Sequence, residues 1–146
     1  MADKPILVWF KNDLRLTDHE PLTRAVDTGR PVVAAVIIDQ RHLQPTPLGF
    51  PRMGPLRARF LFESIAALAQ QLAEKGGRLI VKLGLPEFEI LEIAKNCNAH
   101  AIYTGQEVAP EEVAVLEHVS RAAAALGVEV NAFWHHTLIH YQDIPW

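Results

Sequence analysis

The sequence predicts an α/β fold: a five-stranded, parallel, doubly wound (Rossmann-like) sheet of order 3-2-1-4-5 with helices on both faces. Short apolar runs rich in Val and Ile recur without alternating polar residues, a pattern typical of strands covered on both faces. Helical segments separate these runs, and the repeated order of strand and helix favours parallel pairing with right-handed crossovers. The predicted strands are Ile6–Phe10, Val32–Ile38, Leu79–Leu83, Ala99–Thr104 and Val128–Phe133.

The first two helices are predicted from their start and stop signals. The first begins near Thr17 or Asp18, either of which can cap it, and Pro21 falls within its first turn. The second opens at Gly54–Pro55 and ends at Gly76–Gly77, since proline suits a first helical turn and glycine suits the turn that follows a helix. Its core-facing stripe consists of Leu61, Ile65, Leu68 and Leu72.

The third and fourth helices are predicted to open at Pro86 and Pro110. Acidic residues occupy both first turns, where they oppose the positive end of the helix dipole. These residues are Glu87, Glu89, Glu111 and Glu112.

The predicted strand order nominates a binding edge. In such sheets ligands lie beyond the carboxyl ends of the strands, where the winding reverses, which here falls between the first and fourth strands. Two loops are therefore candidates: Lys11–Asn12–Asp13 after the first strand and Gly105–Gln106–Glu107 after the fourth. Asp39, after the second strand, is expected next to them.

Size and composition indicate one ordinary globular domain. The chain has 146 residues, 49% of them hydrophobic, with a net charge of -3 and a pI near 6.1. This balance gives no sequence-wide attraction to nucleic acid or anionic lipid. A single cysteine, Cys97, excludes an intrachain disulfide and favours an intracellular, cytoplasmic chain. We expect neither a signal peptide nor a membrane span.

Several catalytic and metal-binding patterns are absent. There is no GxGxxG, and "GFPRMGPL" lacks the Lys and Ser/Thr of a P-loop. Neither serine lies in a GxSxG elbow, so no catalytic residue is expected. "WHHTLIH" holds His135, His136 and His140, but no further ligand motif accompanies them, and we predict no metal.

The loop after the first strand leaves two interpretations open. Leu14 and Leu16 are spaced to turn inward, which leaves Asp13 and Arg15 together on the other side. These charges either fix the loop through a local network of ion pairs and hydrogen bonds or contact a ligand directly.

Three segments resemble the DNA photolyase and cryptochrome family. "VWFKNDLRLTDHEPL" resembles the family's opening motif, in which a strand runs into W-F-R-x-D-L-R-L-x-D-N. "GFPRMGPLRARFLFESIAAL" and "HTLIHYQDIPW" look most like the DASH-type cryptochromes within it. Together the three segments reach from near the start of the chain to its last residue.

The resemblance implies the family's N-terminal α/β domain in residues 1–133, with residues 134–146 beginning a connector to a helical domain. That second domain, absent here, binds FAD and the lesion-bearing DNA. A full-length member would be a carbon–carbon lyase for blue-light-driven pyrimidine-dimer repair, or a photoreceptor. The chain alone is expected to be non-catalytic, to meet its FAD domain in cis or in trans, and to reach DNA only through it.

The resemblance also implies an antenna chromophore, with methenyltetrahydrofolate favoured over a deazaflavin. By position, Glu107 and Glu111 are the expected acceptors for a pterin's amino and ring N–H groups. Lys11 stands where the family usually has Arg, so a bidentate contact is lost there. Further candidates are Gln106, Lys11, Asn12, Asp39 and Arg52.

With the family in view, we expect Asp13, Arg15 and Asp18 to fix the loop and the domain interface, while Lys11 and Asn12 border the crevice. Two alternatives stay open: a stand-alone nucleotide-binding or regulatory module, and a docking domain without a ligand. Exposed apolar residues should mark the partner surface and cause self-association. The residues expected there are Phe50, Trp134, Ile139, Tyr141 and Trp146.

Overall fold

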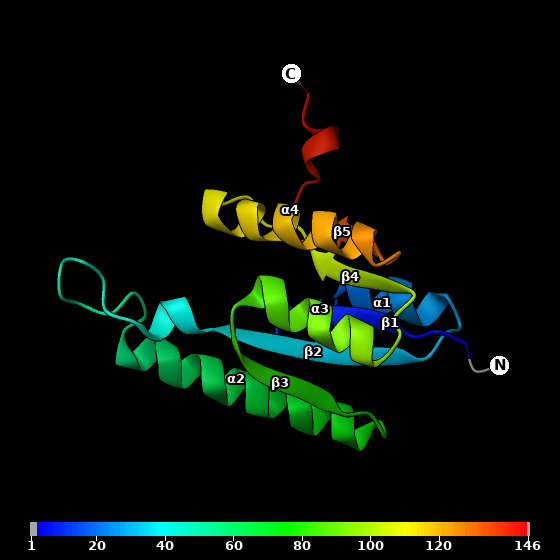
Figure 1. Cartoon of the computed structure of the whole chain (residues 1–146), viewed down its shortest axis with the longest axis horizontal. Helices are drawn as coiled ribbons and strands as arrows, with labels where there is room; N and C mark the ends of the chain where they lie inside the picture. Colours follow the sequence, from blue (N-terminus) through cyan, green and yellow to red (C-terminus); the bar gives the residue numbers. More distant parts are fainter. Residues whose placement is uncertain (1–2, 146) are drawn as a thin grey trace.

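The predicted sheet is present. The computed structural model describes residues 3–145 and contains a five-stranded parallel sheet of order β3-β2-β1-β4-β5. The strands point towards the same end of the domain, and a long loop between η1 and α2 projects there (Figure 1). The strands are β1 (Ile6–Phe10), β2 (Val32–Asp39), β3 (Leu79–Gly84), β4 (Ala101–Gly105) and β5 (Glu129–Phe133).

Helices cover both faces of this sheet. Alternate residues of β1 point to opposite faces, so Leu7 and Trp9 join one core cluster while Ile6, Val8 and Phe10 join the other. The first cluster includes residues of α3 and α4, and the second includes residues of α1 and α2. The helices are α1 (Glu20–Asp27), α2 (Pro55–Glu74), α3 (Pro86–Asn96) and α4 (Pro110–Ala125), with short 3₁₀ turns η1 (Gln40–Leu43) and η2 (Tyr141–Asp143).

The expectation that both faces of every strand are covered is correct for the central strand β1 but wrong for the edge strand β3. Every residue of β1 is buried, whereas Val81 and Leu83 of β3 are exposed, Leu83 by 61%. Since β3 has only β2 as a neighbour, the helices on either side do not cover it completely.

Two strands start later than their apolar runs. The backbone N–H of Ala99 donates to the carbonyl of Ala94, and that of Val128 donates to the carbonyl of Ala123. Because these donors close the ends of α3 and α4, neither residue is free to begin a strand.

The cap of α1 differs from the expectation of Thr17 or Asp18. The helix is capped by His19, whose Nδ1 accepts the backbone N–H of Leu22 at 3.1 Å. Asp18 has a φ of 50°, in the left-handed region, so the chain reverses there before the helix begins. Within residues 3–145, no helix is long and apolar enough to cross a membrane.

His19→Ala is expected to lower the free energy of unfolding by more than about 1 kcal/mol, because it removes a helix cap and a buried hydrogen-bond donor. Thr17→Ala is the matched control, since Thr17 is exposed and does not cap the helix. Urea unfolding of both variants measures the difference. A larger loss for Thr17→Ala than for His19→Ala would contradict the observed cap.

Candidate functional site

The tips of β1 and β4 bring together four of the predicted site residues. Lys11 Nζ donates to the carbonyl of Gly105 at 2.8 Å and lies 3.6 Å from Glu107 Oε2. Asn12 Nδ2 donates to Glu107 Oε1 at 2.8 Å. Gln106 precedes Glu107 in the chain and lines the same surface pocket as Asn12 and Glu107. The loops after β1 and β4 therefore form one continuous shelf, as the strand order predicts.

The charge of Lys11 is balanced within the shelf. Burial lowers the pKa of its ammonium group, while the carboxylates of Glu107 and Asp13 act in the opposite direction. The ammonium also lies 4.7 Å from the centroid of the Trp9 ring, within the range of a cation–π contact. Lys11 and Asn12 thus hold the Glu107 carboxylate in place from two sides.

Two surface pockets adjoin the shelf and share Gln106 and Glu107. The smaller, about 240 Å³, lies directly at the strand tips. It is lined by Asn12, Gln106, Glu107, Val108, Ala109, Glu112, Trp134, His136 and Thr137.

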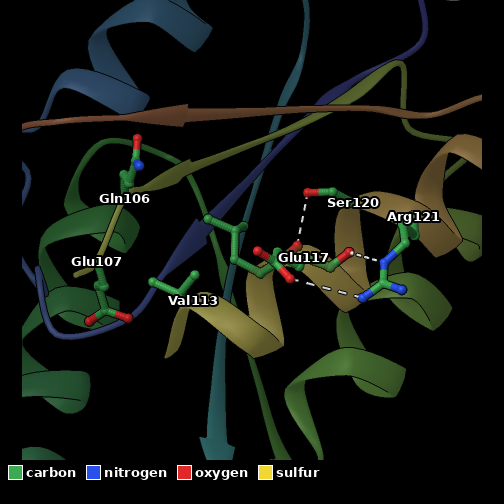
Figure 2. Close-up of a pocket in the computed structure, with 7 residues that line it drawn as sticks. Gln106, Glu107, Val113, Glu117, Ser120 and Arg121 are labelled. Carbon is green, nitrogen blue, oxygen red and sulfur yellow. Dashed lines mark hydrogen bonds and ion pairs between the residues drawn. The ribbon is translucent and has the colours of Figure 1, made fainter. Parts of the chain in front are cut away.

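The larger pocket, about 400 Å³, runs along α4 and is lined by Gln106, Glu107, Val113, Leu116, Glu117, Ser120 and Arg121. Figure 2 shows Gln106 and Glu107 on one side of it and Glu117, Ser120 and Arg121 on the other. Ser120 Oγ donates to the carbonyl of Leu116, and Arg121 Nε donates to that of Glu117. These polar groups are engaged within α4, so the smaller pocket offers the better placed functional groups.

Arg52 and Glu111 do not lie in the shelf. Arg52 Nη1 donates to Glu111 Oε2 at 2.8 Å, which links the loop before α2 to the first turn of α4. Both side chains are exposed, Glu111 by 69%, and neither lines a described pocket.

Asp39 is also engaged elsewhere. Its Oδ1 accepts the backbone N–H of Arg41, and its Oδ2 accepts Arg41 Nη2 at 2.6 Å. Burial would raise the pKa of Asp39, but the hydrogen bonds and charge of Arg41 lower it overall. Arg41 also contacts Glu87, so this triad fixes the carboxyl ends of β2 and β3.

A buried carboxylate behind the shelf holds three segments together. Asp13, 2% exposed, accepts the backbone N–H of Lys11 at 2.8 Å through Oδ1. Its Oδ2 lies 2.9 Å from His19 Nε2 and 3.0 Å from His135 Nε2. Burial alone would raise the pKa of Asp13, but the hydrogen bond from His19 and the Lys11 N–H hold it well below its usual value.

The rest of the loop is fixed locally. Arg15 Nε donates to the carbonyl of Thr17, and Arg15 Nη2 donates to that of Asp18. Leu14 and Leu16 pack against the core cluster that includes residues of α1 and α2, as their spacing predicts. For Asp13 and Arg15 the structure supports the interpretation of a network that fixes the loop.

Sequence reasoning missed the contribution of the segment after β5. Trp134, His136 and Thr137 line the smaller pocket, and Trp134 Nε1 donates to Thr137 Oγ1 at 2.6 Å. Trp134 is half-buried there, whereas Phe50, Ile139 and Tyr141 are exposed as expected. Trp146 lies outside the described residues. The one signal that could have predicted this contribution is the strand order, because it places β5 beside β4 and so brings the segment after β5 to the same edge of the sheet.

Fold and site together define a doubly wound α/β domain with a pocket at the point where its winding reverses, which is where such domains bind ligands. The chain belongs to the DNA photolyase family, whose model matches residues 6–145. It corresponds to the N-terminal α/β domain of photolyases and cryptochromes.

Two comparisons support this assignment, and a third shows the fold alone. Cryptochrome DASH of Synechocystis is 44% identical over 140 residues, covering 96% of this chain. A crystal structure of Synechocystis cryptochrome superposes with a TM-score of 0.96 at 42% identity, covering 100% of this chain and 30% of that one. Sulfolobus tokodaii photolyase shares the fold, with a TM-score of 0.83 at 24% identity, covering 97% of this chain and 32% of that one. The chain spans about 29% of the length of the Synechocystis DASH protein.

Asp13→Ala is expected to lower the free energy of unfolding by about 3–5 kcal/mol, because it leaves buried donors unpaired. The hydrogen bonds depress the folded-state pKa of Asp13, so its contribution is complete above about pH 4 and is lost as the pH falls through the folded-state value. The difference in the free energy of unfolding between wild type and Asp13→Ala should therefore become smaller as the pH falls. Urea unfolding between neutral and acidic pH measures it.

Lys11→Ala is the control for this experiment, since Lys11 lies in the same loop but its ammonium contacts the shelf. Lys11→Ala should lower the free energy of unfolding by less than Asp13→Ala does, because it leaves acceptors unpaired at the edge of the shelf and no buried donors behind it. Equal losses for the two variants would show that Asp13 does not hold the loop.

Proposed function

We propose that this chain is the light-harvesting domain of a photolyase or DASH-type cryptochrome and binds an antenna chromophore at the shelf between β1 and β4. The observation that carries the proposal is the fixed position of Glu107. Its carboxylate is held by Lys11 and Asn12 at the rim of a pocket that Trp134 also lines.

The chemistry of the pocket suits a pterin. A carboxylate can accept two parallel hydrogen bonds, one from an amino group and one from a ring N–H. Trp134 offers an aromatic surface for a flat heterocycle. Gln106 and Asn12 supply further amide groups at the same rim. These features favour methenyltetrahydrofolate over a deazaflavin as the antenna.

The size of the pocket suggests that the chain forms only part of the binding site. Its volume of about 240 Å³ falls below the range of roughly 300–1,000 Å³ usual for pockets that enclose a small organic ligand. One ring system fits, and the rest of a folate extends out of the pocket. In our proposal the remainder of the longer protein covers that part, so the isolated chain binds folate weakly.

The partner in this proposal is an FAD-binding helical domain, in cis or in trans. The chain covers less than a third of the relatives it matches, which leaves room for such a domain. Sulfolobus tokodaii photolyase was solved with two FAD molecules and a light-harvesting cofactor was implied for it. DNA repair or photoreception belongs to the complete, cytoplasmic protein, and DNA contacts the FAD domain.

Exposed apolar side chains near the carboxyl end of the sheet suit the surface that meets this partner. Phe50 and Leu48 lie in the loop before α2, and Ile139 and Tyr141 follow β5. Large apolar residues at the surface mark interaction sites when they gather. Self-association of the isolated domain through these residues stays a prediction.

Glu107→Gln is expected to weaken binding of methenyltetrahydrofolate at least about tenfold, because an amide cannot accept both pterin hydrogen bonds. Glu111→Gln is the matched control, since Glu111 is exposed and pairs with Arg52 away from the pocket. Absorbance titration of the purified chain, up to the solubility limit of the folate, measures both variants.

Two results would count against the proposal. The first is equal folate binding by Glu107→Gln and wild type. The second is a co-purified adenine nucleotide in place of a near-ultraviolet or blue chromophore, which would favour a nucleotide-binding module.

A further inference from the structure

Three metal-ligating side chains converge where β4 ends. Asp13 Oδ2 and His135 Nε2 lie 3.0 Å apart, and Asp13, His135 and His136 each offer one ligand atom within 4.8 Å of the others. The imidazole rings of His135 and His136 have centroids 4.4 Å apart, so these adjacent residues direct both rings to the same side. No other such group occurs within residues 3–145.

All three ligand atoms pack closely against Gly105. A Cβ on Gly105 would lie 2.6 Å from His135 Nε2, 2.8 Å from His136 Nε2 and 3.0 Å from Asp13 Oδ2. Only glycine at position 105 therefore lets the three ligand atoms approach one another this closely. Zinc–ligand distances are about 2.0–2.2 Å, so a small inward movement of the side chains completes the coordination. His136 is exposed and can make that movement.

The surroundings hold Asp13 in the form and orientation that a metal requires. The backbone N–H of Lys11 and His19 Nε2 both contact its carboxylate, and carboxylates that bind metals are themselves usually hydrogen-bonded in this way. His19 Nδ1 accepts the N–H of Leu22, so the proton of His19 is on Nε2 and points at Asp13. The hydrogen bond from His19 uses one lone pair of Asp13 Oδ2, and the second lone pair of that oxygen can bind a metal.

His135 has the freedom to become a ligand. Its Nδ1 makes no hydrogen bond within residues 3–145, so the ring is held only through Nε2. Binding of a metal at Nε2 places the ring proton on Nδ1, a buried atom for which residues 3–145 supply no acceptor, so a bound water molecule has to accept it.

We propose that Asp13, His135 and His136 form a binding site for a divalent first-row transition-metal ion such as Zn²⁺. Two imidazoles and one carboxylate are donors that suit Zn²⁺ and Fe²⁺ more than Mg²⁺ or Ca²⁺. His136 lines the pocket at the strand tips, so the proposed site adjoins the pocket that Glu107 also lines. The proposal concerns the metal alone and does not depend on which chromophore the domain binds.

The test is calorimetric titration of Zn²⁺ into untagged protein treated beforehand with EDTA. Wild type is expected to bind one ion per chain, and His136→Gln should bind at least about tenfold more weakly because one ligand is lost. This variant should fold normally, since His136 is exposed and its side chain makes no hydrogen bond within residues 3–145. Circular dichroism checks the fold.

His118→Gln is the matched control, because His118 is an exposed histidine of α4 outside the cluster, and it should bind Zn²⁺ as wild type does. Replacing Zn²⁺ by Co²⁺ adds a visible absorption band that reports a tetrahedral site. Absence of one-to-one binding by wild type would overturn the proposal. So would equal affinity for wild type and His136→Gln.

Discussion

The structure of the binding edge depends on one buried carboxylate. Asp13 accepts the backbone N–H of Lys11 and contacts the imidazoles of His19 and His135, which belong to three separate segments of the chain. A buried charge is tolerated only when such donors satisfy it, so the three segments must assemble around it together. The end of β1, the start of α1 and the segment after β5 are thereby held at fixed positions.

The anchored loop after β1 positions the polar residues of the shelf. Because the loop after β1 is anchored, Lys11 and Asn12 lie against Glu107 at the tip of β4. The parallel strand order places both tips at the same edge, and the anchored loop turns that edge into a shelf. Trp134 completes the pocket from the segment after β5. In our proposal, a pocket of this size leaves most of a folate for another part of the longer protein to cover.

The sequence predicted the strands and their order, which depend on hydrophobic periodicity and topology. It did not predict which side chains pair with one another when they are far apart in the chain. The strand order placed Lys11, Asn12, Gln106 and Glu107 together correctly. It could not show that Asp39, Glu111 and Arg52 are engaged in ion pairs outside the pocket, because those pairs depend on side-chain packing. The contact between Asp13 and His135 joins residues 122 positions apart, and no local motif records it.

The central claim is that the Asp13 carboxylate anchors two imidazoles through their Nε2 atoms. Proton–nitrogen NMR correlation of the histidine rings in metal-free protein tests it directly. We predict that His19 and His135 are both protonated on Nε2 and that these protons exchange slowly with water, since both rings contact Asp13 away from solvent. Rapidly exchanging protons, or a proton on Nδ1 of His19, would contradict the claim.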